Sequence, residues 1–203
     1  MAILSGSLTA RRFRVLGDVP EGFRDDYRAR LNEQAFREPP NEPGKQEIEG
    51  WVQAHNLLDA EFDDFNRWLY PPYMLFALRI DKRTVPANLL RATVAKKAEA
   101  WCQERGVERC PSSVKAEIKE QIEDDWLRRT LPRVRVVELC WNYDEGWLVL
   151  QSLSDNVAER VRKRFHQTFG LRIVPFSPLD WMPDRDTVEA LLQTVPASFE
   201  EVA

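Results

Sequence analysis

The stretch TLPRVRVVELCWNYDEGWLVLQS, from Thr130 to Ser152, decides the fold class because it contains two β-rich runs joined by a turn. Valine and arginine alternate at its start, and such alternation is typical of a strand with one face on a core and the other in solvent. The segment from Asn142 to Gly146 reads NYDEG, which favours the turn of an antiparallel hairpin. We therefore predict two neighbouring antiparallel strands here.

The same reasoning predicts elements along the rest of the chain. Strands are expected within residues 3–16, 47–54, 73–85 and 171–176, where β-rich runs occur. Helices are expected from about residue 20 to residue 36, and over residues 57–70, 154–170 and 184–195, where apolar residues recur near helical spacing. Residues 37–46 contain three prolines and one glycine, so they are predicted to form a loop.

Two further helices are predicted between the two longest strands. The first runs from Pro86 to Arg105 and ends at Gly106, and the second begins with Ser112 or Ser113 as N-cap. A short link joins them, which predicts a helical hairpin whose apolar stripes face each other or a sheet. These stripes comprise Leu90, Val94, Ala98 and Trp101 in the first helix, and Val114, Ile118, Ile122 and Trp126 in the second.

These elements predict an α+β fold, with an antiparallel β-sheet, helices packed on one face and a protruding helical hairpin. Residues 1–85 and 131–180 together are expected to form the core domain. Residues 86–130 form the hairpin insertion, and residues 181–203 form a short helix and an acidic tail.

Composition describes an ordinary globular chain of 203 residues, 43% hydrophobic and 31% charged. No apolar run approaches the roughly 20 residues that span a bilayer. The N-terminus lacks a basic region before its short apolar stretch, so no secretory signal is expected. Cys102, Cys110 and Cys140 lack CxxC spacing, which favours free thiols in a reducing cytoplasm.

Charge is distributed unevenly along the chain. From Pro71 to Val137, fourteen Lys and Arg stand against nine Asp and Glu, a net +5, between flanks of −4 and −5. A basic region of this kind suggests a polyanionic partner. The candidate phosphate-binding residues, which need only be long cationic side chains, are Lys96, Lys97, Lys115, Lys119, Arg128, Arg129, Arg133, Arg135, Arg162 and Lys163. The rival interpretation is a solvated helical surface whose charges pair with one another.

Catalytic signals are weak, and we predict no catalytic residue, metal or cofactor. His55 and His166 have no partner at ligand or triad spacing, and no Gly-rich phosphate loop is present. Three Asp pairs could serve a metal-dependent nuclease but are interpreted as surface charge. Trp101, Trp126, Trp141 and Trp147 are expected in the core, whereas Trp51, Trp68 and Trp181 are less constrained and could belong to a dimer interface.

The run from Phe76 to Pro178 resembles the recombination-associated protein RdgC family. The features that carry the resemblance are, in order, VPANLL, VKAEIKEQIEDDWLRRTLPR, CWNYDEGWLVLQSLSDNVAERVRKRF and FGLRIVPFSP, with EGWV at residues 49–52 upstream. Two departures stand out. Family members are about 300 residues long, so this chain is expected to lack roughly the last third of the family length, which helps to close the ring. They also usually read Leu-Pro-Arg-Ala-Phe where this sequence has Leu131 to Arg135, so Arg135 replaces an aromatic.

The resemblance implies a non-enzymatic, nucleoid-associated protein of the cytoplasm, with no membrane partner. It would bind double-stranded DNA without sequence preference and would modulate recombination or replication. Family members are homodimers that encircle DNA, and recombination proteins are implied as possible partners. The alternative is a protein–protein interaction or assembly module that kept the fold and lost DNA binding.

Overall fold

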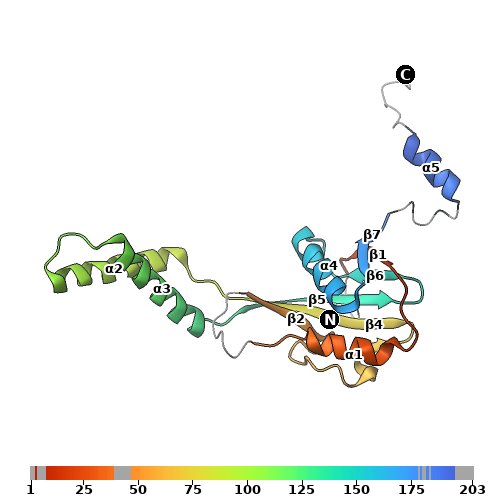
Figure 1. The fold of residues 1–203 in the computed structure, drawn as a ribbon, viewed down its shortest axis with the longest axis horizontal. Coiled ribbons are helices and arrows are strands. Elements are labelled where there is room, and N and C mark those ends of the chain that lie inside the picture. Colours follow the sequence, from red (N-terminus) through yellow and green to blue (C-terminus); the bar gives the residue numbers. More distant parts are fainter. Residues whose placement is uncertain are drawn as a thin grey trace.

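The computed structural model describes residues 8–38, 47–177 and 184–194, together with residues 3, 179 and 182. A seven-stranded antiparallel sheet with strand order β2-β4-β5-β6-β1-β7 forms its centre, and the short β3 pairs with β4. Helices α1 and α4 lie beside the sheet (Figure 1), which confirms the predicted α+β class. The strands are β1 (Arg11–Leu16), β2 (Glu47–Gln53), β3 (Leu69–Tyr70), β4 (Tyr73–Lys82), β5 (Arg133–Asn142), β6 (Trp147–Leu150) and β7 (Arg172–Pro175). The helices are α1 (Phe23–Glu33), α2 (Ala87–Arg105), α3 (Ser112–Arg129), α4 (Asp155–Phe169) and α5 (Arg185–Gln193), with the 3-10 turn η1 at Phe65–Arg67.

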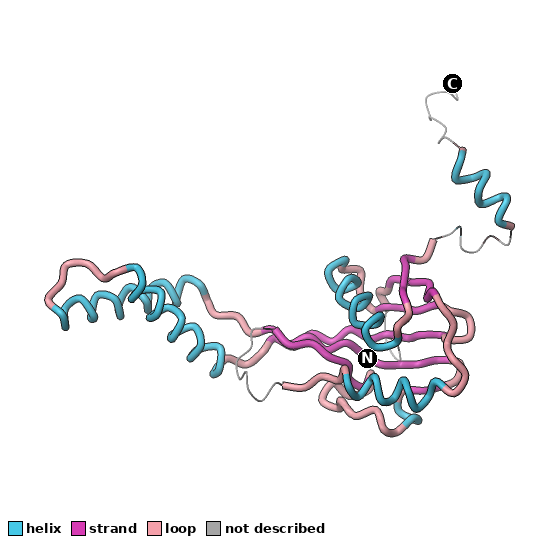
Figure 2. The backbone as a smooth tube through the Cα atoms, viewed as in Figure 1, coloured by secondary structure: helices cyan, strands magenta, loops and turns pink. Residues whose placement is uncertain are grey.

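Strands β4 and β5 pair along their whole length, from Tyr73 opposite Asn142 to Lys82 opposite Arg133. Strand β2 pairs with the other side of β4, from Gln53 opposite Phe76 to Glu47 opposite Lys82. Strand β6 reaches only the Leu139–Asn142 end of β5, so β2, β4 and β5 continue beyond it as a three-stranded ribbon. Figure 2 shows this ribbon leading from the body of the sheet to helices α2 and α3.

The core lies between the sheet and helices α1 and α4. Its centre is a cluster of aromatic rings in which Trp141 of β5 packs against Tyr27 of α1 and Phe165 of α4, with ring centroids 6.0 and 5.0 Å apart. Helix α4 is also joined to β2, because the buried Trp51 indole Nε1 donates a hydrogen bond of 2.8 Å to Thr168 Oγ1. These contacts hold α4 over the strands and so determine where the side chains of α4 lie.

Helices α2 and α3 form the predicted hairpin, and they stand away from the sheet at the end of the ribbon (Figure 1). Only part of the predicted stripes is buried, namely Leu90, Ala98 and Ile122, and Leu127 is buried as well. The stripe residues Val94, Trp101, Val114, Ile118 and Trp126 stay half-buried, because no sheet covers that side of the helices. Ser112 is the first helical residue rather than the N-cap, a position that Pro111 takes.

One predicted helix is wrong. Residues 57–58 form a turn and residues 59–64 have no regular secondary structure, and only η1 and β3 follow them before β4. Short polar side chains accept hydrogen bonds from backbone N–H groups that a continuous helix would use for its own hydrogen bonds. Asn56 Oδ1 accepts from the Leu58 amide, and Asp64 Oδ1 accepts from the Asn66 amide. Such Asx turns compete with helix formation. The first helix is also shorter than expected, since α1 ends at Glu33 and Ala35 instead bridges Trp51.

Several other predictions are confirmed or lie outside the described residues. The hairpin turn at Gly146 has φ 68°, and Gly106 and Gly170 end α2 and α4 in the left-handed conformation. The first strand begins at Arg11, and residues 4–7 are outside the described part. So are most of the predicted loop (39–46), Trp181 and the acidic tail (195–203).

Both outer strands of the sheet have several of their outward backbone groups occupied. On β2, Trp51 accepts from the Phe36 amide and donates to the Gln34 carbonyl, at 2.8 and 3.0 Å. Arg164 Nη2 donates to the Glu49 carbonyl at 3.2 Å. On β7, Arg162 Nε donates to the Ile173 carbonyl at 3.2 Å, and Pro175 has no N–H to offer.

Within the described ranges, no helix is both long enough and apolar enough to cross a membrane.

Candidate nucleic-acid interface

The ribbon brings three cations onto one face of the sheet. Lys82 lies opposite Arg133, and Ile80 lies opposite Arg135. Directly opposed residues of antiparallel strands project to the same side, as do residues two apart on one strand. Lys82, Arg133 and Arg135 therefore share the face on which Ile80 joins the hydrophobic core.

The first turns of helix α4 complete a groove beside these cations. The groove has a volume of about 490 Å³ and is lined by Glu47, Ile80, Lys82, Arg133, Val134, Arg135, Asn156, Val157 and Arg160. Four of its lining side chains are cationic and one is anionic, so their formal charge is +3. We call this the ribbon groove.

The single carboxylate lies at one side of the ribbon groove. Glu47 forms an ion pair with Arg160 and a longer one with Lys82, at 3.7 Å. The hydrogen bond from Arg160 lowers the pKa of Glu47, more than partial burial raises it. Arg160 also binds Glu49, at 3.2 Å. Glu47 thus remains ionised and offsets Arg160 and, more weakly, Lys82.

Arg133 and Arg135 keep their charge available. Both are exposed, and no carboxylate in the described part of the chain forms an ion pair with either. Arg135 Nη2 contacts only the hydroxyl of Ser152, at 3.5 Å. Two uncompensated guanidinium groups on a rigid strand are suited to binding anionic oxygens.

The side chain of Arg83 joins the end of the ribbon to the end of the helical hairpin. Arg83 directly follows β4; its Nε donates to the Thr130 carbonyl at 3.2 Å, and its Nη2 binds Glu38. Its side chain is 11% exposed, so these contacts are largely shielded from solvent. Arg83 therefore acts as a structural cation.

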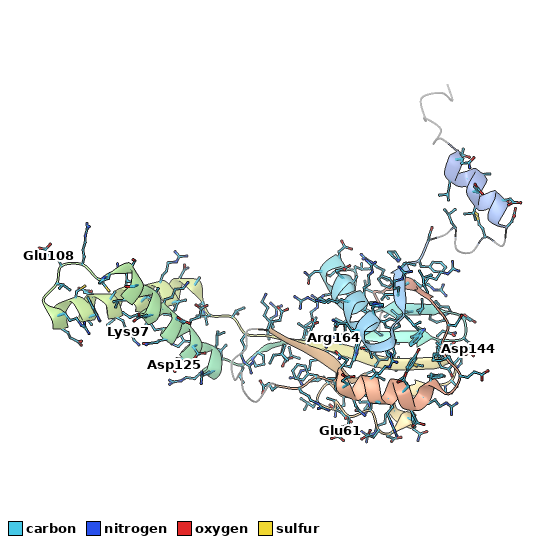
Figure 3. The ribbon with its side chains drawn as sticks, in the orientation of Figure 1. Glu61, Lys97, Glu108, Asp125, Asp144 and Arg164 are labelled. Carbon is cyan, nitrogen blue, oxygen red and sulfur yellow. The ribbon has the colours of Figure 1, made fainter. Side chains whose placement is uncertain are left out.

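The predicted cations of the hairpin do not join the ribbon groove. Lys96 and Lys97 on α2 and Lys115 and Lys119 on α3 are exposed. Figure 3 shows Lys97 and Asp125 on the hairpin, well separated from Arg164 on the body. Arg128 and Arg129 are offset by Asp124 and Asp125 one turn away, at 2.8 and 3.5 Å. The structure thus places this group at a separate surface of mixed charge.

The two predicted cations on α4 lie in a third place. Arg162 and Lys163 line a smaller groove of about 360 Å³ with Glu159, His166 and Arg172. Arg162 binds Glu159 at 3.1 Å as well as the β7 backbone. The ten predicted residues therefore fall into three groups rather than one continuous surface, and only Arg133 and Arg135 lie in the ribbon groove.

Of the four cations that line the groove, Lys82 and Arg160 were not among the ten predicted phosphate-binding residues. The sequence carries a signal for Lys82, because pairing the two longest strands across the hairpin places it beside Arg133. Arg160 has no such signal, since its partners Glu47 and Glu49 are more than 110 residues away.

Groups typical of catalysis do not assemble in the described ranges. No cluster of three or more His, Cys, Asp or Glu there could hold a metal ion. Asp25 and Asp26 pair with Arg28 and Arg30, and Asp63 accepts from Asn32. The acidic pairs therefore behave as the predicted surface charge.

Tryptophans are more deeply buried in the body than in the hairpin. Trp51, Trp68 and Trp141 have no exposed surface, so the first two are core residues rather than dimer contacts. Trp101, Trp126 and Trp147, predicted in the core, are only half-buried.

The sequence matches the model of one known protein family. A family model described as "Putative exonuclease, RdgC" matches residues 12–187, which include all of the sheet except Arg11, together with the hairpin and α4. No curated protein matches the chain.

Proposed function

The chain belongs to the RdgC family, and from this membership together with the ribbon groove we propose that it binds the backbone of double-stranded DNA without sequence preference. Its role would lie in recombination or replication, at the nucleoid. The protein would bind without cutting the DNA. We further propose that it acts as a homodimer.

The observation that carries this proposal is the ribbon groove. Arg133 and Arg135 are exposed and lack carboxylate partners in the described part of the chain, and the groove lining has a formal charge of +3. Phosphate oxygens are bound by long cationic side chains wherever the duplex presents its line of charge, and such contacts carry no sequence information. The groove therefore supports affinity rather than base recognition.

A titration of two unrelated duplexes over a salt series tests this proposal. If Lys82, Arg133 and Arg135 each neutralise one phosphate, log affinity should fall against log salt with a slope of about −2.7, and affinity should drop roughly fortyfold between about 50 and 200 mM salt. Both duplexes should give the same constants. Absent binding at low salt, or binding that salt does not weaken, would reject the proposal.

Replacing the two unpaired arginines separates direct contact from general charge. For Arg133→Gln/Arg135→Gln we expect the slope to fall to about −0.9, because two phosphate contacts are lost. The matched control is Arg24→Gln/Arg28→Gln, which removes the same charge from α1. Arg24 lies near Tyr143, at the far end of β5 from Arg133. An equal effect of both variants would mean that the net charge, and not the groove, sets the affinity.

The second candidate function is a protein–protein module, which the half-buried apolar side chains of the hairpin favour. Trp101 and Trp126 expose part of their rings along α2 and α3, and tryptophan is enriched at protein interfaces. In that case Arg133→Glu/Arg135→Glu should not change the result of the DNA titration and should alter only the self-association of the protein. Sedimentation of the variants alongside the DNA titration distinguishes the two functions.

The exonuclease named in the family description needs its own test. Incubation of end-labelled duplex with Mg²⁺ and with Mn²⁺ should leave the DNA intact if the protein only binds. Progressive shortening that a chelator stops would show the contrary, an exonuclease.

A further inference from the structure

Two cysteines meet at the distal end of the helical hairpin. Cys102 lies in the last turn of α2, and Cys110 directly precedes Pro111, the N-cap of α3. Gly106 ends α2 with φ 64°, and the Val107 amide then donates to the Cys102 carbonyl at 3.1 Å. This turn sends the chain back so that seven residues separate the two cysteines in sequence.

The two cysteines are neighbours. Cys110 Sγ donates to the Pro111 carbonyl oxygen at 3.7 Å, and Cys110 is close enough to influence the pKa of Cys102. Both cysteines are half-buried and free, and both line one shallow cavity of about 400 Å³ with Arg109 and Lys115. Small molecules can therefore reach both sulfur atoms from the same side.

The two thiols differ in their surroundings. Partial burial, reinforced by Cys110, raises the pKa of Cys102, although Lys115 opposes the shift. Because the thiolate is the nucleophile, a raised pKa keeps Cys102 protonated and slow to react. Cys102 is therefore better suited to the second step of an oxidation than to the first.

We propose that Cys102 and Cys110 are a redox-responsive pair that forms a reversible disulfide with peroxide and locks the turn of the helical hairpin. The Cys110 thiolate attacks the O–O bond of hydrogen peroxide, which gives a sulfenic acid and releases one water after proton uptake. The Cys102 thiol then attacks that sulfur, forms the S–S bond and releases a second water. Two thiols and one peroxide thus give one disulfide and two waters, and a low-molecular-weight thiol reverses the reaction by exchange.

The shared cavity and the exposed turn allow the two side chains to approach each other. A disulfide has an S–S length of about 2.05 Å and Cβ atoms about 3.8 Å apart, and both cysteines line the same cavity. The linking turn is exposed, so it can follow the sulfur atoms. Transient disulfides of this kind in a reducing setting are typically regulatory rather than structural.

The third cysteine provides an internal control. Cys140 lies on β5, paired with Leu75 and Val149 within the sheet, and burial raises the pKa of its thiol. Strand β5 belongs to the sheet, and the turn between α2 and α3 lies at the opposite end of the hairpin from the sheet (Figure 1). Cys140 should therefore remain reduced under conditions that oxidise the tip pair.

A peptide map tests the proposal on the whole protein, independently of any DNA binding. Reduced protein is treated with a small excess of hydrogen peroxide, blocked with an alkylating agent and digested with trypsin without reductant. Cleavage after Lys97, Arg105, Arg109 and Lys115 should give residues 98–105 linked to residues 110–115, two hydrogen masses below the sum of the two peptides. Cys140 should be alkylated, and a thiol reductant should release both peptides. Sulfinic or sulfonic acid at Cys110 without the linked pair would overturn the proposal, as would links that run mainly between chains or through Cys140.

Single variants test the order of the two steps. Cys102→Ser should accumulate a sulfenic acid at Cys110 that a dimedone probe traps, whereas Cys110→Ser should give severalfold less labelling at Cys102. Cys140→Ser should form the same tip disulfide as the unmodified chain. Equal labelling in the first two variants would refute the assigned roles, and loss of the tip disulfide in Cys140→Ser would refute the pair itself.

Discussion

The hydrogen bond between Trp51 and Thr168 offers a sharp test of how α4 is held over the sheet. Trp51 Nε1 donates to Thr168 Oγ1 at 2.8 Å, and both residues have no exposed surface. Replacing Thr168 by Val keeps the shape of the side chain but leaves the indole N–H buried without its acceptor. Thr168 Oγ1 also donates to the Arg164 carbonyl, at 2.8 Å, within α4 itself. That bond is a local side-chain contact within the helix, so its loss is the smaller part of the effect.

The expected cost follows from the burial of the unpaired donor. A buried polar group that loses its partner costs about 1–3 kcal/mol, so Thr168→Val should lower the free energy of unfolding by about 2 kcal/mol. In a protein of this size, that corresponds to a fall of roughly 4–8 °C in Tm. Thr168→Ser keeps the hydroxyl and loses one methyl group, so it should cost about 1 kcal/mol.

The assay is urea unfolding followed by circular dichroism, in a double-mutant cycle with Trp51→Phe. Phenylalanine has no N–H, so adding Thr168→Val in that background should cost less than about 0.5 kcal/mol. An increment of about 2 kcal/mol in both backgrounds would refute the reasoning, because the indole donor would then not be the cause.

Two further predictions concern the strand that α4 covers. Glu47 has a pKa below its ordinary value of 4.5, chiefly because Arg160 binds it, so its contribution to stability is complete above about pH 4.5 and is lost as the pH falls through the lowered pKa. Urea titrations between about pH 5 and 3 should therefore show wild-type stability falling more steeply than that of Glu47→Gln, and parallel curves would contradict the assignment. Gly50→Ala would place a Cβ 2.5 Å from the Phe36 nitrogen and 2.8 Å from the Ala35 carbonyl carbon, so it should destabilise by about 1–3 kcal/mol. An unchanged Tm would show that residues 35 and 36 can move aside freely.

Much of the fold could be predicted because the deciding signals are local. The NYDEG turn, the alternation in β5 and the glycines that end α2 and α4 each act on their immediate neighbours. The apolar period of α4 is equally clear, and Val157, Val161 and Phe165 are all buried. Each of these elements lies where its own residues predicted it.

The segment before β4 shows where local reasoning fails. Phe62 and Leu69 follow helical spacing and are buried as a helix would bury them. The backbone is nevertheless held by side chains, since Asn32 Oδ1 accepts from the Phe62 amide and the Trp68 indole donates to the Phe62 carbonyl. The first of these partners lies thirty residues away, so no window along the chain contains it.

The candidate site could be predicted only in part for the same reason. The local charge correctly drew attention to Arg133 and Arg135, which are exposed and adjacent on one face. It could not distinguish Arg164, whose charge is bound by Glu49 across 115 residues of sequence. Positive charge counted along a chain includes cations that the fold has already neutralised.

The occupied borders of the sheet restrict how copies of this protein can associate. A bare outer strand invites a strand from another molecule, which is the route to domain exchange and fibril growth. Here Pro175 and Arg162 occupy part of one border, and Gln34, Phe36 and Arg164 occupy part of the other. Within the described residues, these contacts leave fewer backbone groups for a strand of a second copy, which disfavours sheet-to-sheet fusion when the protein is concentrated.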